Sequence, residues 1–140
     1  MTTLLGRTTA GTNADFNGAN ETAVWKFTAV ASGTLTVIKA QTKVANTASA
    51  CRFGIYSDSA GAPNALLSAQ AVDVLATANG TGVASATLGT TVAITSGVDY
   101  WLGWRAATDA RNFQGDSSGA YRETITGADF PTPWPGGTGT

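Results

Sequence analysis

Hydrophobic and polar residues alternate along several short stretches of this chain. Residues 22–29 place Trp25 and Phe27 on one face of an extended segment and polar side chains on the other. A period of two is the pattern of a half-buried β-strand. Residues 34–40 begin with the same alternation after a Ser-Gly pair. We therefore expect these two strands to form a hairpin or to lie close together.

The strongest alternation covers residues 98–106. One face carries Val98, Tyr100, Leu102 and Trp104, and the other carries Asp99, Trp101, Gly103 and Arg105. We expect Tyr100 and Trp104, which belong to the apolar stripe, to lie in the core. Gly103 removes a side chain from the opposite face and so opens room for a ring or an approaching partner. For Trp101, core packing and contact with a partner both stay open.

Turn signals divide the rest of the chain into further short strands. We expect strands at residues 50–56, 65–74, 83–88, 91–95 and 121–125, of which 65–74 also fits a short helix. The connection from Ser57 to Asn64 combines Asp, Gly and Pro, the residues of a tight turn. About eight strands without a convincing amphipathic helix predict an all-β fold, an antiparallel β-sandwich of jelly-roll type.

The two ends of the chain lack this alternation. Residues 1–20 are rich in Thr, Asn, Gly and Ala and are expected to form an N-terminal arm or edge segment. Residues 21–126 form the predicted β-sandwich domain. Residues 127–140 form a Pro- and Gly-rich C-terminal arm, because proline cannot donate a ladder hydrogen bond. Phe130 and Trp134 are its aromatic anchors, and we expect Trp134 to dock on its own domain or on a neighbouring subunit.

The composition narrows the classes of partner. The chain has 140 residues, of which 43% are hydrophobic and only 12% charged, and its net charge is −1. Nucleic-acid and anionic-membrane binding need clustered Lys and Arg, so we expect neither partner. No apolar run approaches the ~18 residues of a membrane span. The N-terminus lacks the features of a secretory signal, and we expect a product made in a cytoplasm.

The residue types that carry most catalytic chemistry are scarce. The chain has no histidine and one cysteine, which excludes an internal disulfide, a Cys–His nucleophile, and zinc, copper or nonheme iron sites. No nucleophile elbow, phosphate loop or dinucleotide fingerprint is present. The nine acidic residues show no spacing that pairs two carboxylates. The sequence predicts a non-enzymatic protein with no catalytic, cofactor-binding or metal-binding residues.

The aromatic residues indicate where a partner could bind. Trp101 supplies a ring face, and Asp99 and Arg105 beside it supply groups that hydrogen-bond sugar hydroxyls. This combination is compatible with a carbohydrate-binding, lectin-like module. The candidate partner-contact or glycan-contact residues are Trp101, Asp99, Arg105, Phe130 and Trp134.

The middle half of the chain resembles a known β-sandwich module. The resemblance rests on Ile55-Tyr56-Ser57-Asp58, Gly61, Pro63, Leu66-Leu67, Gly97 and Tyr100-Trp101-Leu102, and on the ending Phe130-Pro131-Thr132-Pro133. These residues resemble the jelly-roll domains of bacteriophage virion proteins and of bacterial surface proteins. The pair Gly103-Trp104 departs from the small apolar pair usual in that family. The resemblance implies that Tyr56 and Asp58 close a hairpin and that no residue of the module is catalytic.

The same resemblance implies a function. It suggests a structural protein of a bacteriophage virion, made in the host cytoplasm, and in particular a capsid decoration protein on the outer capsid surface. Its partner would be the major capsid protein or another virion protein, and the chain would form a homo-oligomer, a trimer. The alternative is a carbohydrate-binding module of a tail fibre or surface protein, with a glycan as the ligand.

Overall fold

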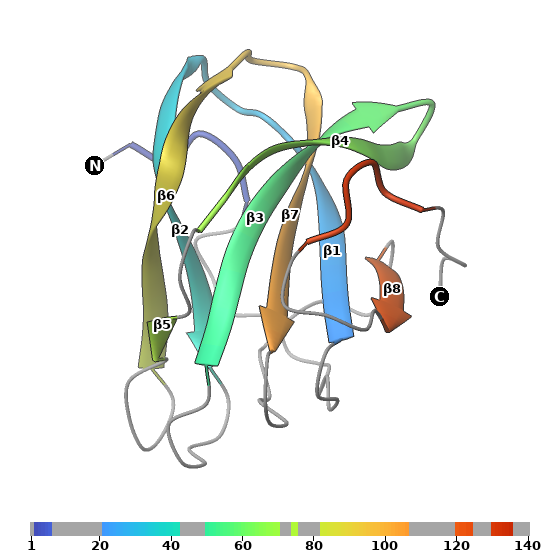
Figure 1. Ribbon diagram of the computed structural model, residues 1–140. Coiled ribbons are helices and arrows are strands. Elements are labelled where there is room, and N and C mark those ends of the chain that lie inside the picture. Colours follow the sequence, from blue (N-terminus) through green and yellow to red (C-terminus); the bar gives the residue numbers. More distant parts are fainter. Residues whose placement is uncertain are drawn as a thin grey trace.

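The computed structural model describes residues 2–6, 21–42, 50–70, 74–75, 82–106, 120–124 and 130–135. Within these ranges the protein is all-β and contains no helix (Figure 1). The strands are β1 (Glu21–Thr28), β2 (Gly33–Thr42), β3 (Ala50–Ser59), β4 (Ala62–Ala69), β5 (Val74–Leu75), β6 (Gly82–Ile94), β7 (Asp99–Ala106) and β8 (Ala120–Thr124).

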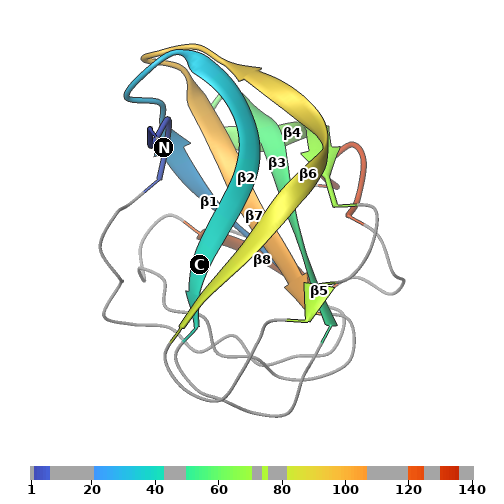
Figure 2. The ribbon, with the colours of Figure 1, turned by 90° about the vertical axis from the view of Figure 1, so that its left-hand side faces the viewer.

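The strands form two antiparallel sheets. The larger has six strands in the order β4-β3-β7-β1-β8, with β5 paired to β3, and the smaller consists of β2 and β6. Figure 2 shows β2 and β6 in front of the larger sheet. The predicted all-β class with antiparallel pairing is therefore confirmed.

The two sheets share one hydrophobic core. Its buried residues come from both layers and include Ile38 of β2, Phe53 and Ile55 of β3, Ala86, Leu88, Val92 and Ile94 of β6, and Tyr100 and Trp104 of β7. The ring of Trp25 stacks on Trp104 at a centroid distance of 6.1 Å. Tyr100 and Trp104 are 7% and 4% exposed, which confirms that the apolar stripe of β7 faces the core.

The sequence allowed the first two strands either to form a hairpin or to lie close together, and the structure shows no hairpin between β1 and β2. β1 pairs with β7 and β8, whereas β2 pairs with β6 in the other sheet. The reason lies in the turn between them. The amide of Ala29 donates to the carbonyl of Val98 (2.9 Å), and the amide of Val30 donates to the carbonyl of Leu4 (2.8 Å). Because these donors bond to other segments, the chain crosses from one sheet to the other instead of closing a hairpin.

The β3–β4 connection is tighter than the composition suggested. β4 begins at Ala62, so that Pro63 and Asn64 belong to a strand rather than to the turn. Only Ala60 and Gly61 remain in the loop, both with positive φ (52° and 83°). Two residues with positive φ are the requirement of the hairpin turn that follows the natural strand twist. Of the strand and the short helix that the sequence allowed from residue 65 onward, the structure shows a strand, β4, up to Ala69.

A further correction concerns β6. The sequence indicated separate strands at 83–88 and 91–95, but one strand runs from Gly82 to Ile94. Ser68 of β4 binds this strand near its centre: its hydroxyl donates to the carbonyl of Thr90 (2.6 Å) and accepts from the amide of Thr90 (3.3 Å). This contact fastens an edge of the larger sheet to the smaller sheet.

Only part of the predicted N-terminal arm belongs to the described residues. Residues 2–6 lie beside the start of β2, and Leu5 is buried in the shared core. A Cβ at Gly33 would approach the Leu4 side chain to 2.9 Å, so these two positions are in close contact. Residues 7–20 lie outside the described ranges.

Candidate functional site

Three of the five candidate residues lie on β7. Asp99, Trp101 and Arg105 project from the face of the larger sheet that points away from β2 and β6, which we call the outer face. The intervening residues of β7 project into the shared core. The division of β7 into two faces, predicted from its alternation, is therefore confirmed.

The other two candidates, Phe130 and Trp134, lie on the same face. They belong to residues 130–135, which we call the strap, and the strap runs across the front of the larger sheet in Figure 1. Phe130 is 5% exposed and Trp134 is 7% exposed. Both pack in one cluster with Val24, Tyr56 and Trp101. Of the two docking surfaces that the sequence left open for Trp134, the structure shows the chain's own sheet.

Two glycines make room for the ring of Phe130. Gly54 and Gly103 are directly opposite each other on β3 and β7. A Cβ at Gly54 would lie 3.2 Å from two atoms of the Phe130 ring, and one at Gly103 would lie 3.4 Å from Phe130 Cε1. A Cβ at Gly103 would also lie 2.7 Å from Val24 Cγ1, so this glycine leaves room for the Val24 side chain and borders the Phe130 ring. The pair forms a slot without side chains, which we call the glycine slot.

Tyr56 holds the strap at two points. Its hydroxyl donates to the carbonyl of Pro131 (2.8 Å). Its ring meets those of Phe130 and Trp134 edge to face, at centroid distances of 6.2 and 5.3 Å. Edge-to-face contacts at such distances are the favoured geometry of aromatic pairs. The amide of Trp134 donates to the carbonyl of Asn64 on β4 (2.9 Å), the backbone hydrogen bond that fixes the far end of the strap.

Trp101 is part of the packing beneath the strap. It is 2% exposed, and its indole N–H donates to Oδ1 of Asp58 (2.8 Å). The other carboxylate oxygen of Asp58 accepts from the amide of Gly61 (3.1 Å) in the hairpin loop. One carboxylate thus joins the β3–β4 turn to the aromatic cluster. In this arrangement Trp101 presents no open indole face to a ligand.

Asp99 lies at the start of β7 and is not in this cluster. It accepts a hydrogen bond from the Thr28 hydroxyl (2.6 Å) and pairs with the Lys26 ammonium at 3.6 Å. The side chains of Lys26 and Asp99 are 41% and 33% exposed. Solvent screens such pairs, so this contact contributes little to stability.

Arg105 lies near the opposite end of β7. It is 1% exposed, and its cross-strand neighbours are Thr22 on β1 and Arg52 on β3. A charged group so fully buried is retained only where polar groups compensate its lost hydration. The structure therefore unites Trp101, Phe130 and Trp134, and it places Asp99 and Arg105 at the two ends of the outer face.

Sequence analysis did not single out Gly54 or Asn64 as site residues. Asn64 contributes its backbone carbonyl, which no side-chain pattern reveals. Gly54 had a visible signal, since it interrupts the bulky strand segment Phe53-Gly54-Ile55. A glycine inside a strand marks close approach of another group.

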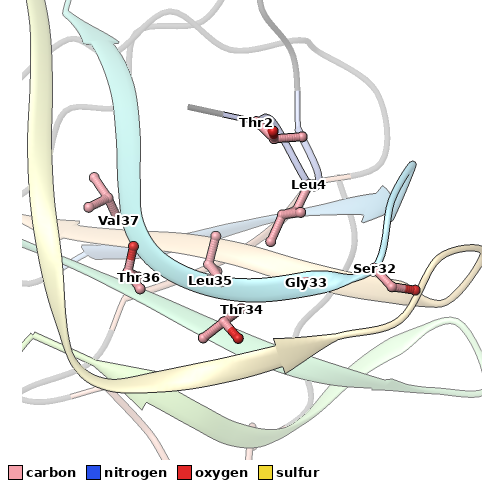
Figure 3. Close-up of a pocket in the computed structure, with 8 residues that line it drawn as sticks. All are labelled: Thr2, Leu4, Ser32, Gly33, Thr34, Leu35, Thr36 and Val37. Carbon is pink, nitrogen blue, oxygen red and sulfur yellow. The ribbon is translucent and has the colours of Figure 1, made fainter.

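A separate groove follows the start of β2. It has a volume of about 390 Å³ and is lined by Thr2, Leu4, Ser32, Gly33, Thr34, Leu35, Thr36 and Val37. Figure 3 shows Leu4 and Leu35 on neighbouring segments at its centre. Its lining consists of hydroxyl, aliphatic and backbone groups without an ionisable side chain. Such a lining can hold a ligand or an extended peptide but supplies no general acid or base.

The described residues lack two further features, a metal-binding cluster and a membrane-spanning helix. They contain no group of three or more His, Cys, Asp or Glu residues placed to hold a metal ion. Nor do those ranges include a helix with the length and apolar character needed to span a membrane.

We compared the chain with models of protein families, with curated proteins and with solved structures, and none of these comparisons found a match.

Proposed function

We propose that this chain is a non-enzymatic structural protein of a bacteriophage virion, and in particular a capsid decoration protein that binds the outer capsid surface. The observation that carries the proposal is the use made of the outer face. Trp101, Phe130 and Trp134 are buried against one another and against Tyr56. The aromatic side chains that the sequence offered for contact with a partner are thus used for packing within the chain. Such packing favours a rigid body, which is what a structural protein requires.

The surface chemistry supports binding rather than catalysis. Only 12% of the residues are charged, and the groove beside β2 offers hydroxyl and aliphatic groups. Uncharged surfaces of this kind suit contact with another protein, because interface centres are depleted of charged side chains. The partner we propose is the major capsid protein or another virion protein.

The proposal includes a finer fold and an assembly state. Two antiparallel sheets around one core are compatible with a jelly-roll β-sandwich, the module that the sequence resembles. We further propose a homotrimer located in the virion after synthesis in the host cytoplasm. Attachment through several identical subunits raises the overall affinity without any new contact within one subunit.

The test uses phage particles produced by the host cells in which this sequence is found. Mass spectrometry of purified virions should detect the chain, and protein added to particles that lack it should cosediment with them. Cosedimentation with tail-free capsids would support the capsid location. Absence from virions, or binding on a glycan array without binding to particles, would overturn the proposal in favour of a sugar-binding module.

A further inference from the structure

The strap is attached to the outer face without becoming part of the sheet. No residue between Phe130 and Pro135 is in a strand. Its backbone accepts one hydrogen bond from the Tyr56 hydroxyl and donates one to the Asn64 carbonyl. The rest of its attachment consists of Phe130 in the glycine slot and Trp134 against Tyr56. This is how a peptide ligand is held, by side-chain pockets and a few backbone bonds.

The receiving surface is built by strands that are hydrogen-bonded to one another rather than to the strap. Gly54 and Gly103 face each other through the regular β3–β7 register, and Tyr56 lies opposite Trp101 in the same ladder. Asn64 lies on β4, which pairs with β3. The strap itself follows β8, which pairs with β1 and is separated from β3 by β1 and β7 in the sheet order. Donor and receiver are therefore distinct structural units.

An uncovered outer face would be costly in water. Without the strap, Val24, Tyr56 and Trp101 would lose the cover under which they are 0 to 2% exposed. Apolar area of this kind favours whatever segment covers it, by about 25 cal/mol per Å². The cover must present a ring for the glycine slot and a second ring for Tyr56.

Two features of the strap act in opposite directions on the stability of its docked state. Its three prolines, Pro131, Pro133 and Pro135, restrict the backbone before docking and so reduce the entropy lost on binding. Against this, Nε1 of Trp134 is buried without a hydrogen-bond acceptor among the described residues. A buried donor without an acceptor weakens the docked state.

We propose that the outer face is a docking site for the strap of another copy of this chain, so that the copies of an oligomer exchange straps. Each contact that the strap makes within one chain is available unchanged between two chains, and exchange of an identical element is a low-cost route to association. The partner is thus defined chemically as a Phe-Pro-Xaa-Pro-Trp-Pro segment. This inference does not depend on the proposed virion function.

The first experiment tests whether the face accepts the strap in trans. A protease site is placed between Thr124 and Phe130 of the full chain, and the folded protein is cleaved so that its strap is no longer covalently attached. A fluorescent synthetic peptide of residues 130–140 should then bind with one-to-one stoichiometry. The same peptide with Phe130→Ala should bind roughly 10-fold or more weakly, because it loses a buried aromatic ring. Failure of the unmodified peptide to bind the folded, cleaved protein would overturn the proposal.

The second experiment tests exchange between copies. A Gly54→Val variant, whose own slot is filled, is mixed with a chain that ends at residue 129, whose slot is empty. Light scattering coupled to size exclusion should show a one-to-one complex, and Phe130→Ala in the Gly54→Val partner should abolish it. If the shortened chain does not fold, the cleaved chain replaces it as receiver. Peptide binding without any complex between the two chains would contradict exchange between copies.

Discussion

The ring of Phe130 lies where the side chain of any residue larger than glycine at position 54 would be. A Cβ on Gly54 would approach three ring atoms of Phe130 to 3.2–3.3 Å, closer than ordinary van der Waals contact. The strap and the sheet are therefore complementary in shape, because β3 has no side chain at the point where the strap places an aromatic ring.

Gly54→Ala should lower the free energy of unfolding by about 1–3 kcal/mol, the usual effect of overpacking a buried site. In a Phe130→Ala background the same change should be neutral or stabilising by about 0.5–1 kcal/mol, because alanine loses less backbone entropy than glycine in a strand. Urea denaturation of the unmodified protein, the two single variants and the double variant gives both values.

Gly103→Ala is the matched control for this cycle. Its Cβ would lie 2.7 Å from Val24 Cγ1 and 3.3 Å from the Ala23 carbonyl oxygen, so its main clash is with β1. In a Phe130→Ala background, Gly103→Ala should therefore keep most of its destabilising effect. Equal relief of both glycine variants by Phe130→Ala would contradict the conclusion that the Phe130 ring packs mainly against Gly54 and that Gly103 is confined mainly by β1.

Asp58→Ala should destabilise the protein by about 2–3 kcal/mol, the range for a hydrogen bond to a charged group plus an unsatisfied buried donor. The change removes the acceptor of the Trp101 indole N–H (2.8 Å) and of the Gly61 amide (3.1 Å). As a control, Asp99→Ala removes an exposed pair with Lys26 and should change stability by less than about 1 kcal/mol. Thermal unfolding of both variants measures the difference, and effects of equal size would refute it.

Tyr56→Phe should loosen the strap without disturbing the core. It removes only the hydroxyl that donates to the Pro131 carbonyl, worth about 0.5–1.5 kcal/mol, and keeps the ring. The amide of Trp134 should exchange with solvent faster in nuclear magnetic resonance spectra.

The control for that variant is Tyr100→Phe, which removes a hydroxyl of the opposite face. The Tyr100 hydroxyl accepts from the amide of Thr95 at 3.1 Å, away from the strap. Its loss should lower overall stability by a similar amount and leave the Trp134 amide as protected as before, relative to global unfolding. Faster exchange of that amide in Tyr100→Phe alone would count against a local role for Tyr56.

Trp101→Ala should destabilise the protein by about 3–5 kcal/mol, as expected for truncation of a large buried aromatic side chain. The residue is 2% exposed and packs beneath the strap. Chemical denaturation measures the change. A sugar-binding platform would give the opposite pattern, with unchanged stability and lost glycan binding.

Ala60→Asn should stabilise the hairpin between β3 and β4 by up to about 1 kcal/mol, because asparagine followed by glycine is the preferred pair where both loop residues have positive φ. Ala60 has φ 52° and precedes Gly61. Ala62→Gly, one residue beyond the loop in β4, should destabilise by a comparable amount. A lower unfolding temperature for Ala60→Asn would contradict the turn geometry.

The period of two was sufficient to predict the faces of β7, since it depends only on the pleat of one strand. It placed Tyr100 and Trp104 in the core and identified Gly103 as a position where a ring approaches. It could not assign strands to sheets. β1 and β2 are consecutive and both alternate, yet hydrogen bonds from Ala29 and Val30 to distant segments direct them into different sheets.

The composition of the C-terminal end predicted an irregular segment with two aromatic anchors but not its destination. That destination depends on the coincidence of Gly54 and Gly103 across two strands that are far apart in the sequence. It also depends on the carbonyl of Asn64, a group that every residue has. Information of this kind arises only from the register of the folded sheet.

The proline content of the strap has a consequence for the kind of assembly that it can support. Three of its six residues have no amide hydrogen, and the amide of Trp134 is already bonded to Asn64. Sheets propagate into fibres when one chain offers the next a row of free amides and carbonyls. A strap that is held by rings in pockets offers no such row. Copies joined through it would gain no edge for backbone pairing at the strap, so this contact by itself would not seed cross-β fibres even at high local concentration.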